Sequence, residues 1–152
     1  MKKVSAFILA ALLFVPAVFG QSADKMTDVL KSGEVTLGQA CYFFATASEN
    51  VKDNISYEKA LEYFKERSVI DSSCSENDKA SLGSLALLAN DVFNIQGSLC
   101  LSLFKTGRYA YRQMKADGVF SRYDDPALIP NGHKFFSVLT RCLDKYELRS
   151  AE

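Results

Sequence analysis

The segments Ala60–Ile70, "ALEYFKERSVI", and Ala110–Phe120, "AYRQMKADGVF", lie 50 positions apart and align without a gap. Alanine, lysine and valine recur at matching places, and a large apolar side chain fills the fifth position of both segments. Near the end of each, a small residue, Ser68 or Gly118, precedes valine and another apolar residue. Similarity at a fixed spacing indicates repeated units that bury their faces against one another.

The residues upstream of these segments also correspond. Thr36-Leu-Gly38 and Ser81-Leu-Gly83 each place a capping-type residue before an apolar run with helical spacing, and Asn131-Gly132 precedes a third such run. Thr36 and Gln39 also match the capping box, which marks a helix start. We therefore expect repeat-like units at about residues 36–70, 81–120 and 131–146.

The spacing of apolar residues predicts an all-α fold of about five or six helices in degenerate helix-pair repeats. Tyr57, Ala60, Leu61 and Phe64 form one amphipathic stripe. The third unit contains only a first helix, and the stretch with Met26, Val29 and Leu30 reads as a lone second helix at the front end. Residues 99–104 fit either a short strand or a buried helical turn.

Residues 1–20 have the features of a bacterial secretory signal peptide. Two lysines follow Met1, an apolar run extends from Phe7 to Phe19, and Gly20 precedes the expected cleavage point. The run is shorter than the about 20 residues that a membrane-spanning helix needs. We expect a single helical domain at 21–152, periplasmic or secreted, with no stable membrane span after cleavage.

The charge of the mature chain is close to zero. Removing Lys2 and Lys3 lowers 18 basic residues to 16, against 18 acidic residues, which gives a net charge of −2. Such a weak field offers no electrostatic basis for binding nucleic acid.

The chain contains four cysteines, Cys41, Cys74, Cys100 and Cys142. An oxidising compartment would let them form disulfides in any of three pairings, which the sequence does not distinguish, and buried free thiols are the alternative. They form no CxxC or Cys/His cluster, and no phosphate or dinucleotide motif occurs, so we expect no metal or cofactor.

Two sets of residues are candidates for function. Arg108 and Arg112 stand one helical turn apart and, with Tyr109, would form a cationic aromatic face for a carboxylate or a sugar. The alternative is an ordinary solvated face beside a packing tyrosine; Tyr111, at a core-stripe position, is expected to pack. His133 is the only histidine, and an enzyme of the Ser/His or Cys/His type would depend on it.

The helix, connector and second helix ending in a small residue plus Val-Phe or Val-Ile resemble the S-layer-homology repeats of bacterial envelope proteins. The resemblance spans residues 25–146 and implies helix pairs that bind cell-wall polymers in grooves between units. Leu37-Gly38 and Tyr57–Phe64 are also similar in sequence to tetratricopeptide repeats. In those repeats, however, the second-helix alanine lies about twelve residues after the first-helix glycine. Here that alanine follows by 22 residues, at position 60 after 38.

These observations favour an exported, non-catalytic interaction module whose partner is a cell-wall polymer or an envelope protein. One alternative is a small periplasmic enzyme that uses His133. The other is a structural subunit of an envelope assembly that docks through residues 99–104.

Overall fold

The computed structural model describes residues 17–48, 51, 54–95 and 106–147, and the side chains among them from residue 22 on. In chain order the elements are α2 (Ala17–Lys31), α3 (Leu37–Ala47), α4 (Tyr57–Glu66), α5 (Leu82–Phe93), α7 (Gly107–Ala116), α8 (Gly132–Cys142) and the π-helical turn η1 (Leu143–Glu147). Within these ranges extended pairing is limited to one bridge between Thr36 and Lys79, so the predicted all-α class is confirmed. The predicted segment 99–104 lies outside the described residues.

Four of the helices begin with the same capping arrangement, which Ser56 makes at the start of α4 by accepting from the Lys59 N–H. The side chains of Thr36, Ser81 and Asn131 accept hydrogen bonds from the backbone N–H three residues later, at the starts of α3, α5 and α8. Gln39 returns a bond from its Oε1 to the Thr36 N–H at 3.0 Å, which completes the predicted capping box. The polar residues ahead of each apolar run therefore fix where these helices start.

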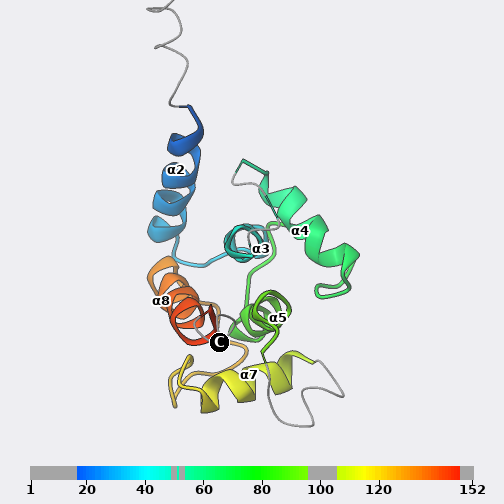
Figure 1. Cartoon of the computed structure of the whole chain (residues 1–152), viewed down its shortest axis with the longest axis vertical. Helices are drawn as coiled ribbons and strands as arrows, with labels where there is room; N and C mark the ends of the chain where they lie inside the picture. Colours follow the sequence, from blue (N-terminus) through cyan, green and yellow to red (C-terminus); the bar gives the residue numbers. More distant parts are fainter. Residues whose placement is uncertain (1–16, 49–50, 52–53, 96–105, 148–152) are drawn as a thin grey trace, which may run out of the picture.

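The helices form inner and outer sets (Figure 1). The inner helices α3, α5 and α8 lie toward the centre, and the outer helices α2, α4 and α7 lie around them. Matching residues of α4 and α7 face the core: Ala60 and Ala110 have no exposed surface, nor have Phe64 and Met114. Tyr111 is 4% exposed, as the repeat pattern predicts.

Each of the first two helix pairs closes on itself through its connector. After α4, the chain returns to the start of α3, where the Gly38 N–H donates to the Glu76 carbonyl at 2.9 Å. After α7, the chain returns in the same way to α5, and the Gly83 N–H donates to the Pro126 carbonyl at 2.8 Å. We call α3 with α4 the first unit and α5 with α7 the second unit.

The two half-units expected at the chain's ends complete one another. The start of α8 lies on the end of α2, where the Gly132 N–H donates to the Ser32 carbonyl at 3.1 Å. The approach is so close that a Cβ at Gly132 would lie 1.8 Å from the Val29 carbonyl oxygen. The third unit is therefore α8 with α2, assembled from opposite ends of the described chain.

The three units meet at the residues that precede the inner-helix caps. The Val35 N–H donates to the Pro130 carbonyl and the Ala80 N–H donates to the Val35 carbonyl, both at 2.9 Å. The third bond of such a ring would need an N–H on Pro130, which proline lacks. All three residues are buried, so this incomplete ring lies inside the core. We call Val35, Ala80 and Pro130 the central ring.

A lysine secures α2 against the first unit. The Lys25 ammonium lies 3.8 Å from the ring centroid of Tyr42 and 5.3 Å from that of Tyr57, and it donates to the Ile55 carbonyl at 2.5 Å. Burial lowers the pKa of Lys25, since the protein offers less solvation than water. In the described part of the chain, no helix has both the length and the apolar character that crossing a membrane requires.

Candidate functional site

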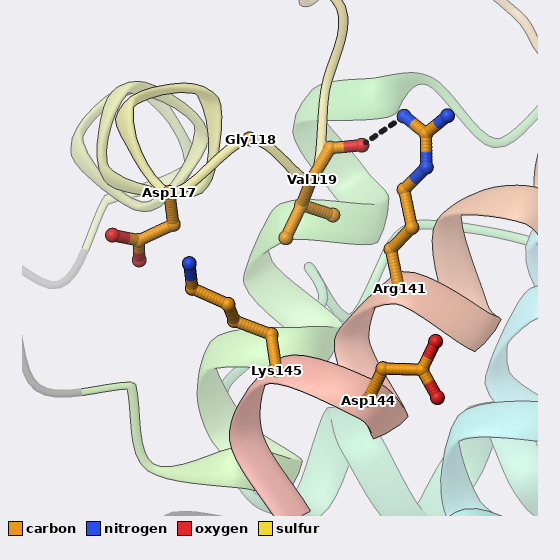
Figure 2. Close-up of a pocket in the computed structure, with 6 residues that line it drawn as sticks. All are labelled: Asp117, Gly118, Val119, Arg141, Asp144 and Lys145. Atoms are coloured by element: carbon orange, nitrogen blue, oxygen red, sulfur yellow. Dashed lines mark hydrogen bonds between the residues drawn. The ribbon is translucent and has the colours of Figure 1, made fainter.

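An open pocket of about 180 Å³ lies where α7 ends beside α8 and η1 (Figure 2). Its walls come from the second and third units, so it is a groove between units. The residues that line it are Asp117, Gly118, Val119, Arg141, Asp144 and Lys145. We call it the α7–α8 groove.

The turn that ends α7 places Gly118 and Val119 in the lining of this groove. Gly118 has φ of +83°, which glycine adopts without steric cost. Its N–H donates to the Lys115 carbonyl at 3.2 Å, and the Val119 N–H donates to the Met114 carbonyl at 2.9 Å. This pair of bonds is the Schellman motif, and it turns the chain out of the helix so that the Val119 carbonyl faces α8.

Hydrogen bonds in both walls of the groove hold two charged side chains in place. Arg141 donates from Nη1 to the Val119 carbonyl at 3.1 Å, which ties α8 to the end of α7 (Figure 2). On the other wall the Asp117 carboxylate accepts hydrogen bonds from the Tyr146 hydroxyl at 2.9 Å and from Gln113 Nε2 at 3.2 Å. Both charged groups are thus held in place before any ligand arrives.

Side chains of both positive and negative charge line the groove. Arg141, Asp144 and Lys145 are exposed, and in Figure 2 the Lys145 side chain points toward Asp117. No ion pair joins the four charged lining residues in the described structure. A guanidinium has five N–H donors and a carboxylate accepts several hydrogen bonds, so the groove has capacity left for a ligand that both donates and accepts.

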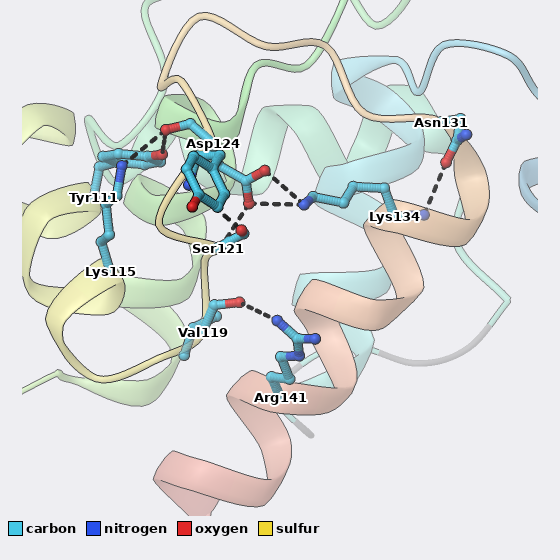
Figure 3. Close-up of polar contacts among 9 residues, drawn as sticks. Tyr111, Lys115, Val119, Ser121, Asp124, Asn131, Lys134 and Arg141 are labelled. Carbon is cyan, nitrogen blue, oxygen red and sulfur yellow. Dashed lines mark hydrogen bonds and ion pairs between the residues drawn. The ribbon is translucent and has the colours of Figure 1, made fainter.

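A partly buried ion pair supports the connector beside the groove (Figure 3). The Asp124 carboxylate accepts from Lys134 Nζ at 2.7 and 2.8 Å and from the Ser121 N–H at 2.8 Å. The Asp124 carbonyl accepts from the Tyr111 hydroxyl at 2.7 Å and from Lys115 Nζ at 2.9 Å. These contacts hold the connector between α7 and α8.

The environment of Asp124 favours its charged form. Burial by itself would raise the pKa of Asp124, but the hydrogen bonds from Lys134 and the Ser121 N–H, with the charges of Lys134 and Lys115, outweigh it and lower the pKa. Sequence reasoning did not single out Asp124 as a functional residue. It missed this pair because Lys134 follows by ten residues, across a loop whose path no periodicity predicts.

The residues that the sequence singled out lie elsewhere on the molecule. Arg108 and Arg112 are exposed, one turn apart on α7, and they do not line the groove. Tyr109 is half-buried and packs against the core. His133 is exposed in the first turn of α8. No cluster of three or more His, Cys, Asp or Glu side chains suited to a metal ion occurs in the described part of the chain.

The cysteines that the structure describes are free thiols. Cys41 and Cys142 are buried and Cys74 is half-buried, whereas Cys100 lies outside the described residues. The disulfide that the sequence allowed is therefore not formed among these three. Burial raises the pKa of Cys41 to about 12, with a further contribution from Cys74, and burial raises that of Cys142 to about 12.

No protein-family model matches this chain, and no significant match is found among curated proteins or solved structures. The resemblance to S-layer-homology repeats stays a prediction.

Proposed function

We propose that this protein is an exported, non-catalytic interaction module that binds an acidic saccharide of the bacterial cell wall in the α7–α8 groove. The observation that carries the proposal is the groove itself. It joins two units, and two of its charged side chains, Arg141 and Asp117, are fixed by contacts within the protein and form no ion pair with each other.

The residue types suit recognition of a sugar polymer. Sugar hydroxyls donate and accept hydrogen bonds, so they can use carboxylates such as Asp117 and Asp144 together with the donors of Arg141. An acidic substituent would gain charge-assisted bonds from Arg141 and Lys145. The groove is open to solvent, which allows a long polymer to bind along it without threading an end.

Export is the second part of the proposal, and it rests on the signal-peptide pattern of residues 1–20. α2 begins at Ala17 and continues through the predicted cleavage point after Gly20. Cleavage there would leave most of the helix, including Lys25 and Val29, in the mature protein.

The test is binding of the mature chain to purified cell-wall material, with and without its acidic polymers. Arg141→Ala with Lys145→Ala removes the groove's cations, and Arg108→Ala with Arg112→Ala removes the same charge from α7 outside the groove. Because hydrogen bonds to charged groups contribute about 1.5–3 kcal/mol, we expect the first variant to bind at least about tenfold more weakly.

The α7 variant is the matched control and should bind like the natural chain. Equal loss in both variants would indicate a non-specific charge effect and contradict the groove proposal. Loss in the α7 variant alone would move the site to the arginine pair predicted from the sequence. Circular dichroism checks that each variant keeps its helicity.

A further inference from the structure

The pairing of units gives the α7–α8 groove a structural counterpart at the junction of α4 and α5. The two junctions correspond position by position at a spacing of 50, with Arg67 in the place of Asp117 and Asp91 in the place of Arg141. α4 also ends as α7 does: Ser68 has φ of +57°, and the Val69 N–H donates to the Phe64 carbonyl at 3.0 Å. The same two places therefore hold opposite charges in reversed order.

At the first junction the two charges bind each other. Arg67 donates from Nε to Asp91 Oδ2 at 2.8 Å and from Nη2 to Asp91 Oδ1 at 2.9 Å. This two-bond geometry is the strong form of an arginine–carboxylate pair. The guanidinium also lies 5.3 Å from the ring centroid of Tyr63, which supports it from α4.

At the second junction the equivalent charges have other partners. Arg141 binds the Val119 carbonyl, and Asp117 accepts hydrogen bonds from Tyr146 and Gln113. Gln113 stands in the place of Tyr63, so each residue supports its own helix's C-cap side chain. Tyr146, in η1, is 4% exposed, and its hydroxyl donates to the Asp117 carboxylate at 2.9 Å.

We propose that Tyr146, with Gln113, is a positioning residue that keeps the α7–α8 groove open by holding Asp117 away from Arg141. The Arg67–Asp91 pair shows the closed form of the same junction. In this protein the α7–α8 groove is therefore open, and its counterpart between α4 and α5 is closed by an ion pair. An acidic group of a ligand binds Arg141 as the Asp91 carboxylate binds Arg67. The binding of a ligand rests on the proposed function; the rest does not.

A double-mutant cycle tests the positioning role without any ligand. Arg67→Ala and Asp91→Ala, alone and together, should show a coupling of about two- to fivefold in the unfolding equilibrium constant, in the range of exposed ion pairs. Asp117→Ala and Arg141→Ala should be additive in the natural chain. In a Tyr146→Phe, Gln113→Ala background, the same two substitutions should become coupled about as strongly as the first pair.

Coupling between Asp117 and Arg141 in the natural chain would overturn the inference, as would additivity in the altered background. If the double background does not fold, Tyr146→Phe alone replaces it, and coupling there is judged by the same criterion. A purely structural role for Tyr146 would lower stability without creating any coupling between the other two residues.

Binding to acidic cell-wall polymer is measured in a separate experiment. The Tyr146→Phe, Gln113→Ala variant keeps Arg141 and Lys145, and we expect it to bind about fivefold more weakly because Asp117 then competes for Arg141. Undiminished binding by that variant would count against the inference. If the natural chain itself binds no polymer, the proposed function fails, and the cycle alone decides whether Tyr146 positions Asp117.

Discussion

At the scale of single residues, the turns that end α4 and α7 show how the residue at one position affects the free energy of unfolding. Ser68 and Gly118 both have positive φ, but only glycine avoids the clash of a Cβ with the following carbonyl oxygen. Nothing lies within 4 Å of a Cβ placed at Gly118, so the backbone conformation alone makes a larger residue unfavourable there.

Exchanging the two residue types should therefore move stability in opposite directions. We expect Ser68→Gly to raise the free energy of unfolding by about 1 kcal/mol, and Gly118→Ser to lower it by a similar amount. Urea denaturation of both variants measures the change. Destabilisation by Ser68→Gly would show that the Ser68 side chain contributes more than its backbone strain costs.

The cysteines should differ in reactivity. A pKa of about 12 leaves the Cys41 and Cys142 thiols protonated at neutral pH, and both are buried. In a Cys100→Ser chain we expect a thiol reagent to label Cys74 first and the other two only at the rate of unfolding. Mass spectrometry of the labelled peptides distinguishes the sites. Early labelling of Cys142 would contradict its burial in α8.

At the scale of elements, the connector between α7 and α8 depends on the charge of Asp124. Its pKa is lower in the folded chain than in the unfolded chain, because Lys134 and the Ser121 N–H bind the carboxylate. The stabilisation is complete above the unfolded value of about 4, and it is lost as the pH falls through the lower folded value.

We expect acid to destabilise the natural chain below about pH 4 more steeply than an Asp124→Asn chain. The variant should also be less stable at pH 7, because Lys134 loses its partner at a site where Asp124 is only 11% exposed. Thermal unfolding at several pH values measures how steeply the stability of each chain, natural and variant, changes with pH. Parallel slopes would mean that other carboxylates account for the acid sensitivity.

The elements themselves were the most predictable part of the structure. Cap residues and apolar spacing are local, so the starts of α3, α5 and α8 follow from Thr36, Ser81 and Asn131. The candidate groove was not predictable, because Asp117 and Arg141 are 24 positions apart and meet only through the packing of two units. The 50-residue repeat was the available signal: it aligns Asp117 with Arg67 and Arg141 with Asp91, as charge-reversed positions.

At the scale of the whole molecule, the third unit makes the two ends of the described chain depend on one another. Val29 of α2 is fully buried, and the start of α8 rests on the last turn of α2. The sequence predicted α2 and α8 as separate half-units but not their pairing. The short link from Lys31 to Val35 differs from the long connectors that close the other units.

Removing residues 1–31 should accordingly weaken α8 more than α4. We expect faster amide hydrogen exchange across α8 and a lower melting temperature, since the truncated chain lacks the surface that covers Gly132. Hydrogen exchange with mass spectrometry resolves the two helices. Equal protection of α8 in both chains would show that α2 is dispensable for the third unit.

The joining of α2 to α8 also affects when the protein can reach its native state. A ribosome makes α2 before any of the other described helices, whereas its partner α8 is the last α-helix among them to be made. The Gly132–Ser32 contact and the Val35–Pro130 bond of the central ring both wait for that late segment. The core of this molecule therefore cannot be completed until α8 has been synthesised, and until then α2 lacks its partner.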